Sequence, residues 1–183
     1  MTLMIKKTLL TAATVSLLAL SPGIQAASDS ATVNITATVV DNTCTPQWST
    51  NGVDVAMGRV SLKDFGSDKI GATEAFTLNL AGCGSGATSV KVTASGEPDT
   101  TDSSLFKNTE TTEGVAATGV GVEIWGDSAQ ATKMAPDGSN SVMYPIANSK
   151  ADMTFLAKLK QSGATAPGAG AVKSVVTMIF DYQ

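Results

Sequence analysis

Apolar and polar residues alternate along several short stretches of the chain, and a period of two is typical of β-strands that bury one face. These stretches are residues 31–40, 74–83, 89–95, 118–127, 152–161 and 170–183. No amphipathic helix of ten or more residues follows residue 26, although residues 61–72 could hold a short helical turn. Many short strands separated by Gly, Pro, Asn and Asp predict an all-β fold, an antiparallel β-sandwich in a single domain.

Two of the connections between these strands differ in character. Residues 96–114 are mostly polar, and we expect them to form a long exposed connection with little structure. Residues 163–170 are rich in Gly and Ala and predict a loop before the last strand.

The first 26 residues follow another pattern. Two lysines at residues 6–7 precede an apolar run, residues 9–20, and a Pro-Gly pair then leads to the small residue Ala26. This is the pattern of a secretory signal peptide, and the apolar run is too short to span a bilayer of about 30 Å. We therefore expect cleavage after Ala26 or Ala27 and export of the protein.

The charge of the exported chain is mildly acidic. Removal of the signal, which holds two lysines and no acidic residue, lowers the formal net charge from −4 to −6. No cluster of Lys and Arg remains, and nucleic-acid binding needs such a cluster to neutralise phosphates. We therefore expect no nucleic-acid partner, and the acidity favours solubility.

Two cysteines, Cys44 and Cys83, lie in the exported part of the chain. An isolated pair in an exported protein predicts one disulfide. Closing a loop of this length is worth roughly 3–4 kcal/mol in the chain-entropy model. Two thiolates without histidine do not make a zinc site, so no metal is expected.

Catalytic chemistry finds little support, because the sequence contains no histidine. This absence excludes the common general base and the Ser–His and Cys–His nucleophile systems. Residues 126–130 read GDSAQ and residues 82–89 read GCGSGATS, and both are interpreted as turns because neither leads into a helix or has a catalytic partner. The carboxylates are scattered in predicted loops. We therefore expect no enzyme, no catalytic residue and no cofactor.

The two ends of the exported chain each carry an alternating apolar strand. The first places on one face Val33, Ile35, Ala37 and Val39. The last places on one face Val172, Val176, Met178, Phe180 and Tyr182. Ser174 interrupts this second row. An apolar strand at a chain end leaves an open edge that invites another chain. Two such ends suggest a sandwich that is completed by a strand from another molecule.

Several segments, taken in order, resemble the chaperone–usher pilins of the type 1 fimbrial subunit family. The similar segments are TVNITATVVDNTC leading to the first cysteine, VAMGRV (Val55 to Val60), FTLNLAGC ending at the second cysteine, GVGVEIWG in the middle, and FLAKL before the Gly-rich loop. Tyr182 at the penultimate position and Gly170, fourteen places from the end, resemble the closing signature of the family.

This resemblance implies an incomplete immunoglobulin-like β-sandwich, the pilin fold, which lacks one strand and receives a donor strand from a neighbouring subunit. It divides the chain into a signal peptide (1–26), an N-terminal donor-strand extension (27–40) and a pilin domain (41–183). The expected donor residues are Val33, Ile35, Ala37 and Val39. The strand that borders the groove for the chaperone and the donor is expected to comprise Gly170, Val172, Val176, Met178, Phe180 and Tyr182.

The resemblance also implies a function: a structural subunit of a bacterial fimbria that contributes to adhesion, as a rod subunit or as a minor tip or adaptor subunit. The implied partners are a periplasmic pilus chaperone, an outer-membrane usher, adjacent pilin subunits and a host receptor reached through the assembled pilus. The implied location is the cell surface, reached through the periplasm.

Two other interpretations of the same residues remain open. The terminal strands are also compatible with an ordinary sandwich that completes itself within one chain. A single-domain adhesin module that binds a glycan or a protein is the alternative function, because Trp48, Trp125 and Tyr144 could line a sugar site. Core packing is the competing role for these aromatic residues.

Overall fold

The computed structural model describes residues 34–37, 43–127 and 129–183. The chain divides into two units, one ending at Ala37 and the other beginning at Thr38, and the second contains the fold. Its elements are β1 (Thr45–Pro46), a 3₁₀ helix η1 (Leu62–Asp64), β2 (Ile70–Ala81), β3 (Ser89–Gly96), β4 (Phe106–Lys107), β5 (Val120–Trp125), β6 (Lys133–Met134), β7 (Asp137–Pro145), β8 (Lys150–Gln161) and β9 (Val176–Tyr182).

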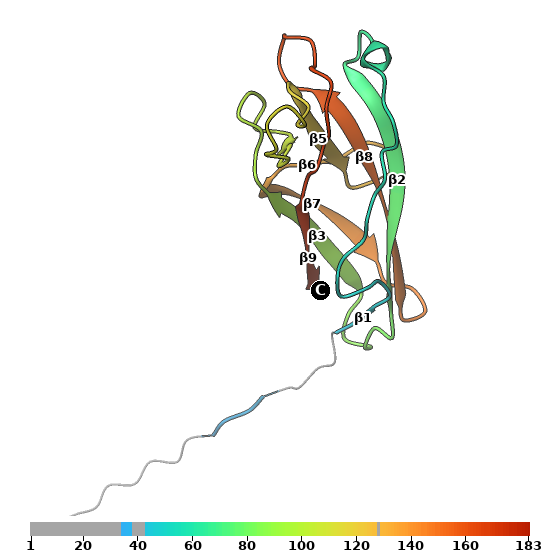
Figure 1. The fold of residues 1–183 in the computed structure, drawn as a ribbon. Helices are drawn as coiled ribbons and strands as arrows, with labels where there is room; N and C mark the ends of the chain where they lie inside the picture. Colours follow the sequence, from blue (N-terminus) through green and yellow to red (C-terminus); the bar gives the residue numbers. More distant parts are fainter. Residues whose placement is uncertain (1–33, 38–42, 128) are drawn as a thin grey trace, which may run out of the picture. The chain divides into compact units, whose positions relative to one another are not determined.

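These strands form two antiparallel sheets, which can be followed in Figure 1. In the described residues, one sheet has the order β1-β2-β8-β5-β4, with β6 also paired to β5, and the other has the order β7-β3-β9. The longest ladder joins β2 to β8, with Phe76 opposite Phe155. The all-β sandwich expected from the sequence is confirmed.

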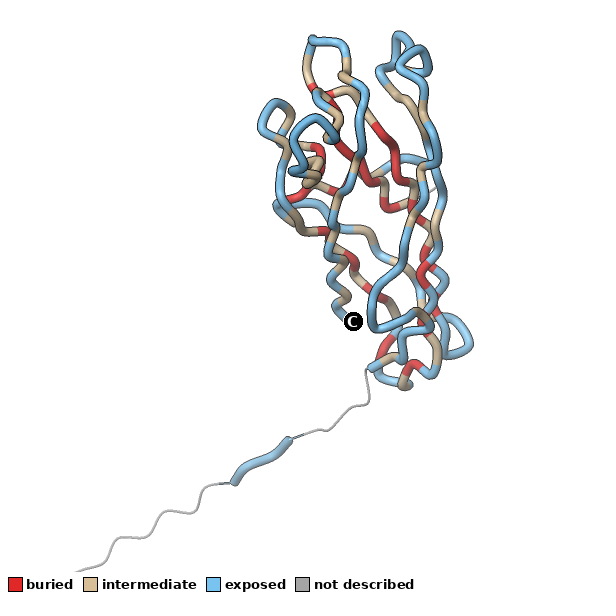
Figure 2. Tube along the Cα trace, in the orientation of Figure 1, coloured by how far each residue is buried: buried red, intermediate tan, exposed pale blue. Residues whose placement is uncertain are grey.

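Alternation explains how the two sheets share one core. Leu78 and Leu80 of β2 face inward, whereas Thr77 and Asn79, which alternate with them, are exposed. From the second sheet, Val90 and Val92 of β3 are fully buried in the same cluster. The largest fully buried side chains come from both sheets and one connection: Phe106, Phe155, Leu80, Leu105, Met134, Met153, Val90 and Val92. Figure 2 shows the buried positions recurring along these strands.

The connection at residues 96–114 departs from the prediction of an exposed segment with little structure. Leu105 and Phe106 are fully buried, and Phe106 lies opposite Val122 in the β4–β5 pair. The chain turns back before them because Asp99 accepts hydrogen bonds from the main-chain N–H groups of Thr101 and Asp102. Two apolar side chains in a polar segment therefore extend the core.

The remaining expectations concern the short helical turn, the signal peptide and the first apolar strand. The short helical turn expected within residues 61–72 is η1, where Ser61 and Asp64 form a reciprocal capping box. The signal peptide lies outside the described residues, as do Val33 and Val39. Among the described residues, no helix has the length and apolar character needed to cross a membrane.

Candidate functional site: an open groove beside the last strand

A groove of about 1000 Å³ runs along one side of the sandwich. One wall is the segment that precedes η1, from Asn51 to Val60, and the other is residues 167–176 together with the start of β9. The two walls run side by side in Figure 1. Between them lie apolar side chains of β2, β5 and β8, namely Phe76, Leu78, Val120, Val122, Ile124, Ala157 and Leu159. The groove therefore leads directly onto the core.

The β9 wall is an open sheet edge. In the described part of the chain β9 pairs with β3 on one side, from Val176 opposite Gly96 to Tyr182 opposite Val90. Exposed and half-buried residues alternate along β9, and the half-buried residues pack against the core. The main-chain groups on the groove side of β9 are therefore available to another strand.

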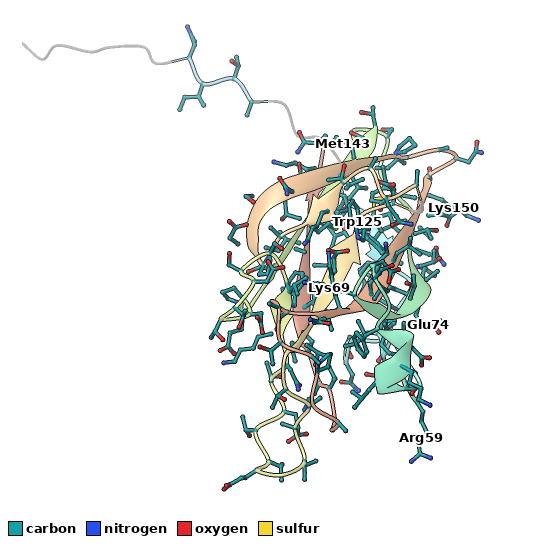
Figure 3. The ribbon with its side chains drawn as sticks, turned by 90° about the horizontal axis from the view of Figure 1, so that it is seen from above. Arg59, Lys69, Glu74, Trp125, Met143 and Lys150 are labelled. Carbon is teal, nitrogen blue, oxygen red and sulfur yellow. A yellow bond between two sulfur atoms is a disulfide. The ribbon has the colours of Figure 1, made fainter. Side chains whose placement is uncertain are left out.

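The opposite wall is extended but belongs to no ladder in the described residues. VAMGRV (55–60), one of the segments that resemble the family, has no strand assignment. Val55 and Met57 are half-buried against the core, and Ala56 between them is exposed. The alternation ends at Gly58, which has a φ of 69°, and the following Arg59 is exposed and extends away from the ribbon in Figure 3.

The structure brings most of the residues expected at the acceptor strand to this groove. Gly170, Val172, Val176, Met178 and Phe180 line it. Tyr182 does not, since it lies past the end of the groove, half-buried and opposite Val90. The strand itself begins at Val176 rather than at Gly170. Of the expected donor residues, Ile35 is 87 % exposed and Ala37 is exposed as well.

Gly170 is positioned where the chain passes closest to a neighbouring segment. A Cβ atom at Gly170 would lie 2.5 Å from the carbonyl oxygen of Val115 and closer still to main-chain atoms of Ala116 and Ala117. Ala171 donates its N–H to the Val115 carbonyl over 2.6 Å. Only glycine allows this approach, which holds the groove wall against residues 115–117.

Ser174, which interrupts the apolar row, also borders the groove. Its hydroxyl oxygen is buried and has no hydrogen-bond partner among the described residues. The neighbouring Lys173 donates its main-chain N–H to the side-chain oxygen of Asn108 over 2.9 Å. The wall before β9 is thus held by side-chain hydrogen bonds from Asn108 and by main-chain hydrogen bonds to residues 109 and 115–117, and not by a ladder with β3.

The three aromatic residues considered for a sugar site lie in separate environments. Trp48 borders the groove, with its ring centroid 5.2 Å from that of Phe180. Tyr144 packs edge-on against Phe155 in the interior, and the main-chain oxygens of Gly126 and Thr154 share the single proton that its hydroxyl donates. Trp125 lies on β5, with the Lys158 ammonium 5.4 Å from its ring centroid. They do not line one common site.

A buried charge network on β5 was missed by sequence reasoning. The Glu123 side chain is 3 % exposed and accepts hydrogen bonds of 2.9 Å from the ammonium groups of Lys133 and Lys160. The indole N–H of Trp125 donates to it over 2.7 Å. Burial raises the pKa of Glu123, but these three donors outweigh burial and lower the pKa to about 2. All partners are satisfied, so the network stabilises the fold.

Within the described ranges, no group of three or more Cys, Asp and Glu side chains is arranged to hold a metal ion. The two cysteines form the expected Cys44–Cys83 disulfide. It joins the residue before β1 to the loop after β2.

The comparison with known protein families decides the identity of the fold. The sequence profile of the family described as "Fimbrial protein" matches residues 33–183. The chain belongs to the fimbrial protein family. A relative with a fimbrial name supports this: the uncharacterized fimbrial-like protein YcbV of Escherichia coli K12 is 30 % identical over 91 % of this chain and 94 % of its own length.

Two further comparisons agree with membership in the fimbrial family. The S-fimbrial protein subunit SfaG of an Escherichia coli O6:K15:H31 strain is 28 % identical over 82 % of each chain. Among solved structures, a subunit of a chaperone–usher pilus superimposes with a TM-score of 0.62 at 19 % identity, covering 85 % of this chain and 96 % of the other. The fold is therefore that of a pilin, and the fimbrial protein is a structural subunit of an extracellular pilus. Its family is structural rather than enzymatic.

Proposed function

We propose that this fimbrial subunit polymerises by donor-strand exchange, with its groove accepting residues 27–40 of a neighbouring subunit and its own residues 27–40 entering the groove of the next. The observation that carries the proposal is the open groove itself, an apolar channel bordered by the unpaired edge of β9. A strand inserted there gains main-chain hydrogen bonds and fills the channel with alternate side chains.

The dimensions of the donor fit the groove. From Val172 to Phe180 the wall spans eight residue steps, or about 26 Å in extended conformation. Val33 to Val39 spans six steps, about 20 Å. The whole apolar row of the donor can therefore lie in the groove at once.

The energetics favour an occupied groove. Burying the three larger donor side chains (Val33, Ile35 and Val39) contributes roughly 5–9 kcal/mol before entropy costs. The receiving side also gains, because apolar atoms of the core along the groove leave water. An exposed apolar channel beside an unpaired strand otherwise invites aggregation.

The same reasoning calls for a temporary occupant before assembly. A newly exported subunit has an open groove until its neighbour arrives, and a periplasmic chaperone that lends a strand would protect it. The similar pilin comes from a chaperone–usher pilus, which supports this route through the periplasm and an outer-membrane usher. Residues 1–26 would direct the export, with cleavage after Ala26 or Ala27.

The position of the subunit in the fibre follows from the presence of both a donor strand and an acceptor groove in one chain. A chain with a donor strand and an acceptor groove can occupy an internal position, as a rod subunit or an adaptor. A separate sugar-binding role has no observation in its favour, because Trp48, Trp125 and Tyr144 do not converge.

Paired substitutions on the two faces of the donor test the proposal. Ile35→Asp places a carboxylate on the face that enters the groove, whereas Thr36→Asp places the same charge on the opposite face. Because burying an unpaired carboxylate is very costly, Ile35→Asp is expected to abolish polymerisation of the purified, chaperone-complexed subunit, and Thr36→Asp to preserve it. Polymers are scored by electrophoresis without boiling.

Deletion of residues 27–40 separates the two halves of the mechanism. The shortened chain should still form a stable chaperone complex and should still accept a donor from a second subunit, but it should not add to a preceding one. A shortened chain that folds alone as a stable monomer, with no chaperone bound, would show that the sandwich is complete without a donor.

A further inference from the structure

The groove wall that contains β9 continues before the start of this strand without a partner strand. Strand β3 ends at Gly96, opposite Val176, so residues 171–175 lie beyond the β3–β9 ladder. Exposed and half-buried residues nevertheless alternate without a break from Ala171 to Gln183. Residues 171–175 are therefore extended and continue the line of β9.

The side chain of Asn108 takes the place of the missing partner strand. Its amide nitrogen donates hydrogen bonds of 3.0 Å to the main-chain oxygens of Ala117 and Ala171. Its amide oxygen accepts hydrogen bonds from the main-chain N–H groups of Glu110 and Lys173, over 3.1 and 2.9 Å. A carboxamide has two hydrogens to donate and two lone pairs that accept, so the full capacity of this side chain is used.

Asn108 is itself fixed to the core. It directly follows β4, in which Phe106 is fully buried. The next residue, Thr109, donates both its main-chain N–H and its hydroxyl to the Lys173 carbonyl, over 2.7 and 3.0 Å. Asn108 therefore ties the groove wall to a strand of the first sheet.

The hydrogen bonds of this wall leave it on one edge. In an extended chain, the main-chain groups of every second residue point to the same edge. Ala171 and Lys173 bond to the segment after β4, and Gln183, in the same series, bonds to the start of β3. Val172 and Ser174 belong to the other series, and both line the groove. Among the described residues, their main-chain groups have no hydrogen-bond partner.

We propose that Asn108 is a positioning residue that keeps the edge of Val172 and Ser174 open to the incoming donor strand, and so extends the acceptor edge past the end of β9. The inference rests on the proposed donor-strand function. Without the Asn108 amide, the N–H of Lys173 and the carbonyl of Ala171 each lose a partner, and this part of the wall is no longer held extended. The donor strand then pairs with β9 alone.

Donor peptides of different length probe the two ends of the groove separately. The full chain is refolded with an excess of a labelled peptide of residues 29–41. Two truncated peptides are used in parallel, residues 34–41 without Val33 and residues 29–38 without Val39. Dissociation rates are compared within each variant, so a general loss of stability cancels. In the unmodified chain each truncation removes an apolar donor residue and is expected to speed dissociation at least tenfold.

Asn108→Ala should remove the effect of one truncation only, the one at the end that lies against Val172 and Ser174. That effect is expected to fall below threefold, while the other stays at tenfold or more. Asn108→Asp keeps the size of the side chain but loses both N–H donors, and it should behave in the same way. Asn140→Ala is the matched control, since it removes an amide that donates to the Lys133 carbonyl over 2.9 Å outside the groove. It should preserve both effects.

Hydrogen exchange in the unmodified chain gives a second measurement that needs no variant to fold. With the peptide of residues 29–41 bound, the N–H groups of Val172 and Ser174 should be protected, because they pair with the donor strand. With one of the truncated peptides their exchange should speed at least tenfold, whereas the N–H of Met178 in β9 should stay protected. Rapid exchange of Val172 and Ser174 with the longest peptide bound would overturn the proposal.

The outcomes separate this proposal from the donor-strand function. If the peptide of residues 29–41 does not bind the unmodified chain, the donor-strand function itself fails. If it binds, but neither truncation speeds dissociation, the donor does not use the ends of the groove and Asn108 has no such role. The role is equally overturned if both truncation effects persist in Asn108→Ala and Asn108→Asp. It is also overturned if both effects fall together, because Asn108 would then support the whole groove and not one end.

Discussion

Gly170 shows how a single residue shapes the groove. Its replacement by alanine would place a methyl group against the main chain of Val115–Ala117, where the nearest atoms belong to backbone that cannot rotate away. We expect Gly170→Ala to destabilise the donor-complemented subunit by about 1–3 kcal/mol. Gly66→Ala is the control, since a Cβ there would meet only the Asp68 carboxylate at 3.6 Å. Urea unfolding measures both, and equal midpoints would contradict the prediction.

Glu123 gives a prediction about pH. Its pKa lies at about 2 in the folded chain, below the ordinary value of 4.5. Because the folded-state pKa is lowered, the network stabilises the fold fully above pH 4.5, and this contribution is lost as the pH falls towards 2. Glu123→Gln is expected to cost about 2–4 kcal/mol at pH 7, since it leaves two lysines without their partner.

The comparison of unfolding midpoints at pH 7, 4.5 and 2.5 checks this expectation. The difference between the unmodified chain and Glu123→Gln should shrink at the lowest pH. Glu113→Gln changes an exposed carboxylate and should change the free energy of unfolding at pH 7 by no more than about 0.5 kcal/mol. A constant difference between the unmodified chain and Glu123→Gln over all three pH values would refute the assigned role.

At the scale of single residues, the sequence predicts inward-facing apolar residues well and buried charged residues poorly. Val90 and Val92 follow from alternation, and both are fully buried. Glu123 occupies the alternate position between Val122 and Ile124, which the pattern assigns to an exposed face. Its burial depends on Lys133 and Lys160, which come from other strands, and no local pattern contains that information.

At the scale of the element, the segment before β9 illustrates what alternation leaves open. The pattern places Val172 and Val176 on one face, and both line the groove, but the pattern does not distinguish a strand in a ladder from an extended chain outside one. Residues 171–173 are held by Ala116 and by Asn108 instead of by β3, so the strand begins later than expected. Similarly, Leu105 and Phe106 are isolated in a polar segment and show no period that would predict their burial.

Tyr144 links two elements and supports a prediction at the same scale. From β7 its hydroxyl reaches the carbonyl of Thr154 in β8 over 3.2 Å and that of Gly126 after β5. Burial raises the pKa of this hydroxyl well above its usual range, so it stays protonated and donates. Tyr144→Phe removes the link between the sheets and is expected to cost about 1–3 kcal/mol. Tyr182→Phe, at the edge of the second sheet, is the comparison. Calorimetry of both variants, each with a donor peptide in its groove, would show whether Tyr144→Phe lowers the stability more than Tyr182→Phe does.

At the scale of the whole molecule, the proposed donor-strand exchange leads to a prediction about its rate. In the proposed donor strand, Ala37 stands where many members of the resembling family carry glycine. In Ala37→Gly the methyl group of Ala37 is lost, and the donor strand should pass the neighbouring subunit more easily. We therefore expect this substitution to speed the replacement of the chaperone by the donor subunit. Following the exchange over time by electrophoresis checks this, and an unchanged rate would count against a steric role for Ala37.

Sequence and structure contribute differently at this scale. Order and spacing of short motifs were sufficient to predict the family and the sandwich. The ring contact between Trp48 and Phe180 could not be predicted, because it joins residues far apart in the chain that meet only once both sheets have formed.

The hydrogen bonds of Gln183 have a practical consequence for labelling. Its main-chain N–H and C=O both form hydrogen bonds to Thr88 and Ser89, so an affinity tag or fluorescent protein joined directly after it would be attached to an ordered part of the sheet. The turn between β7 and β8 is better suited, since Asn148 and Ser149 are exposed and adopt positive φ angles typical of a tight turn. A short epitope inserted there would be carried once per subunit, and a fibre rod built from repeated copies of this subunit would present it as a repeating array to antibodies or to a surface.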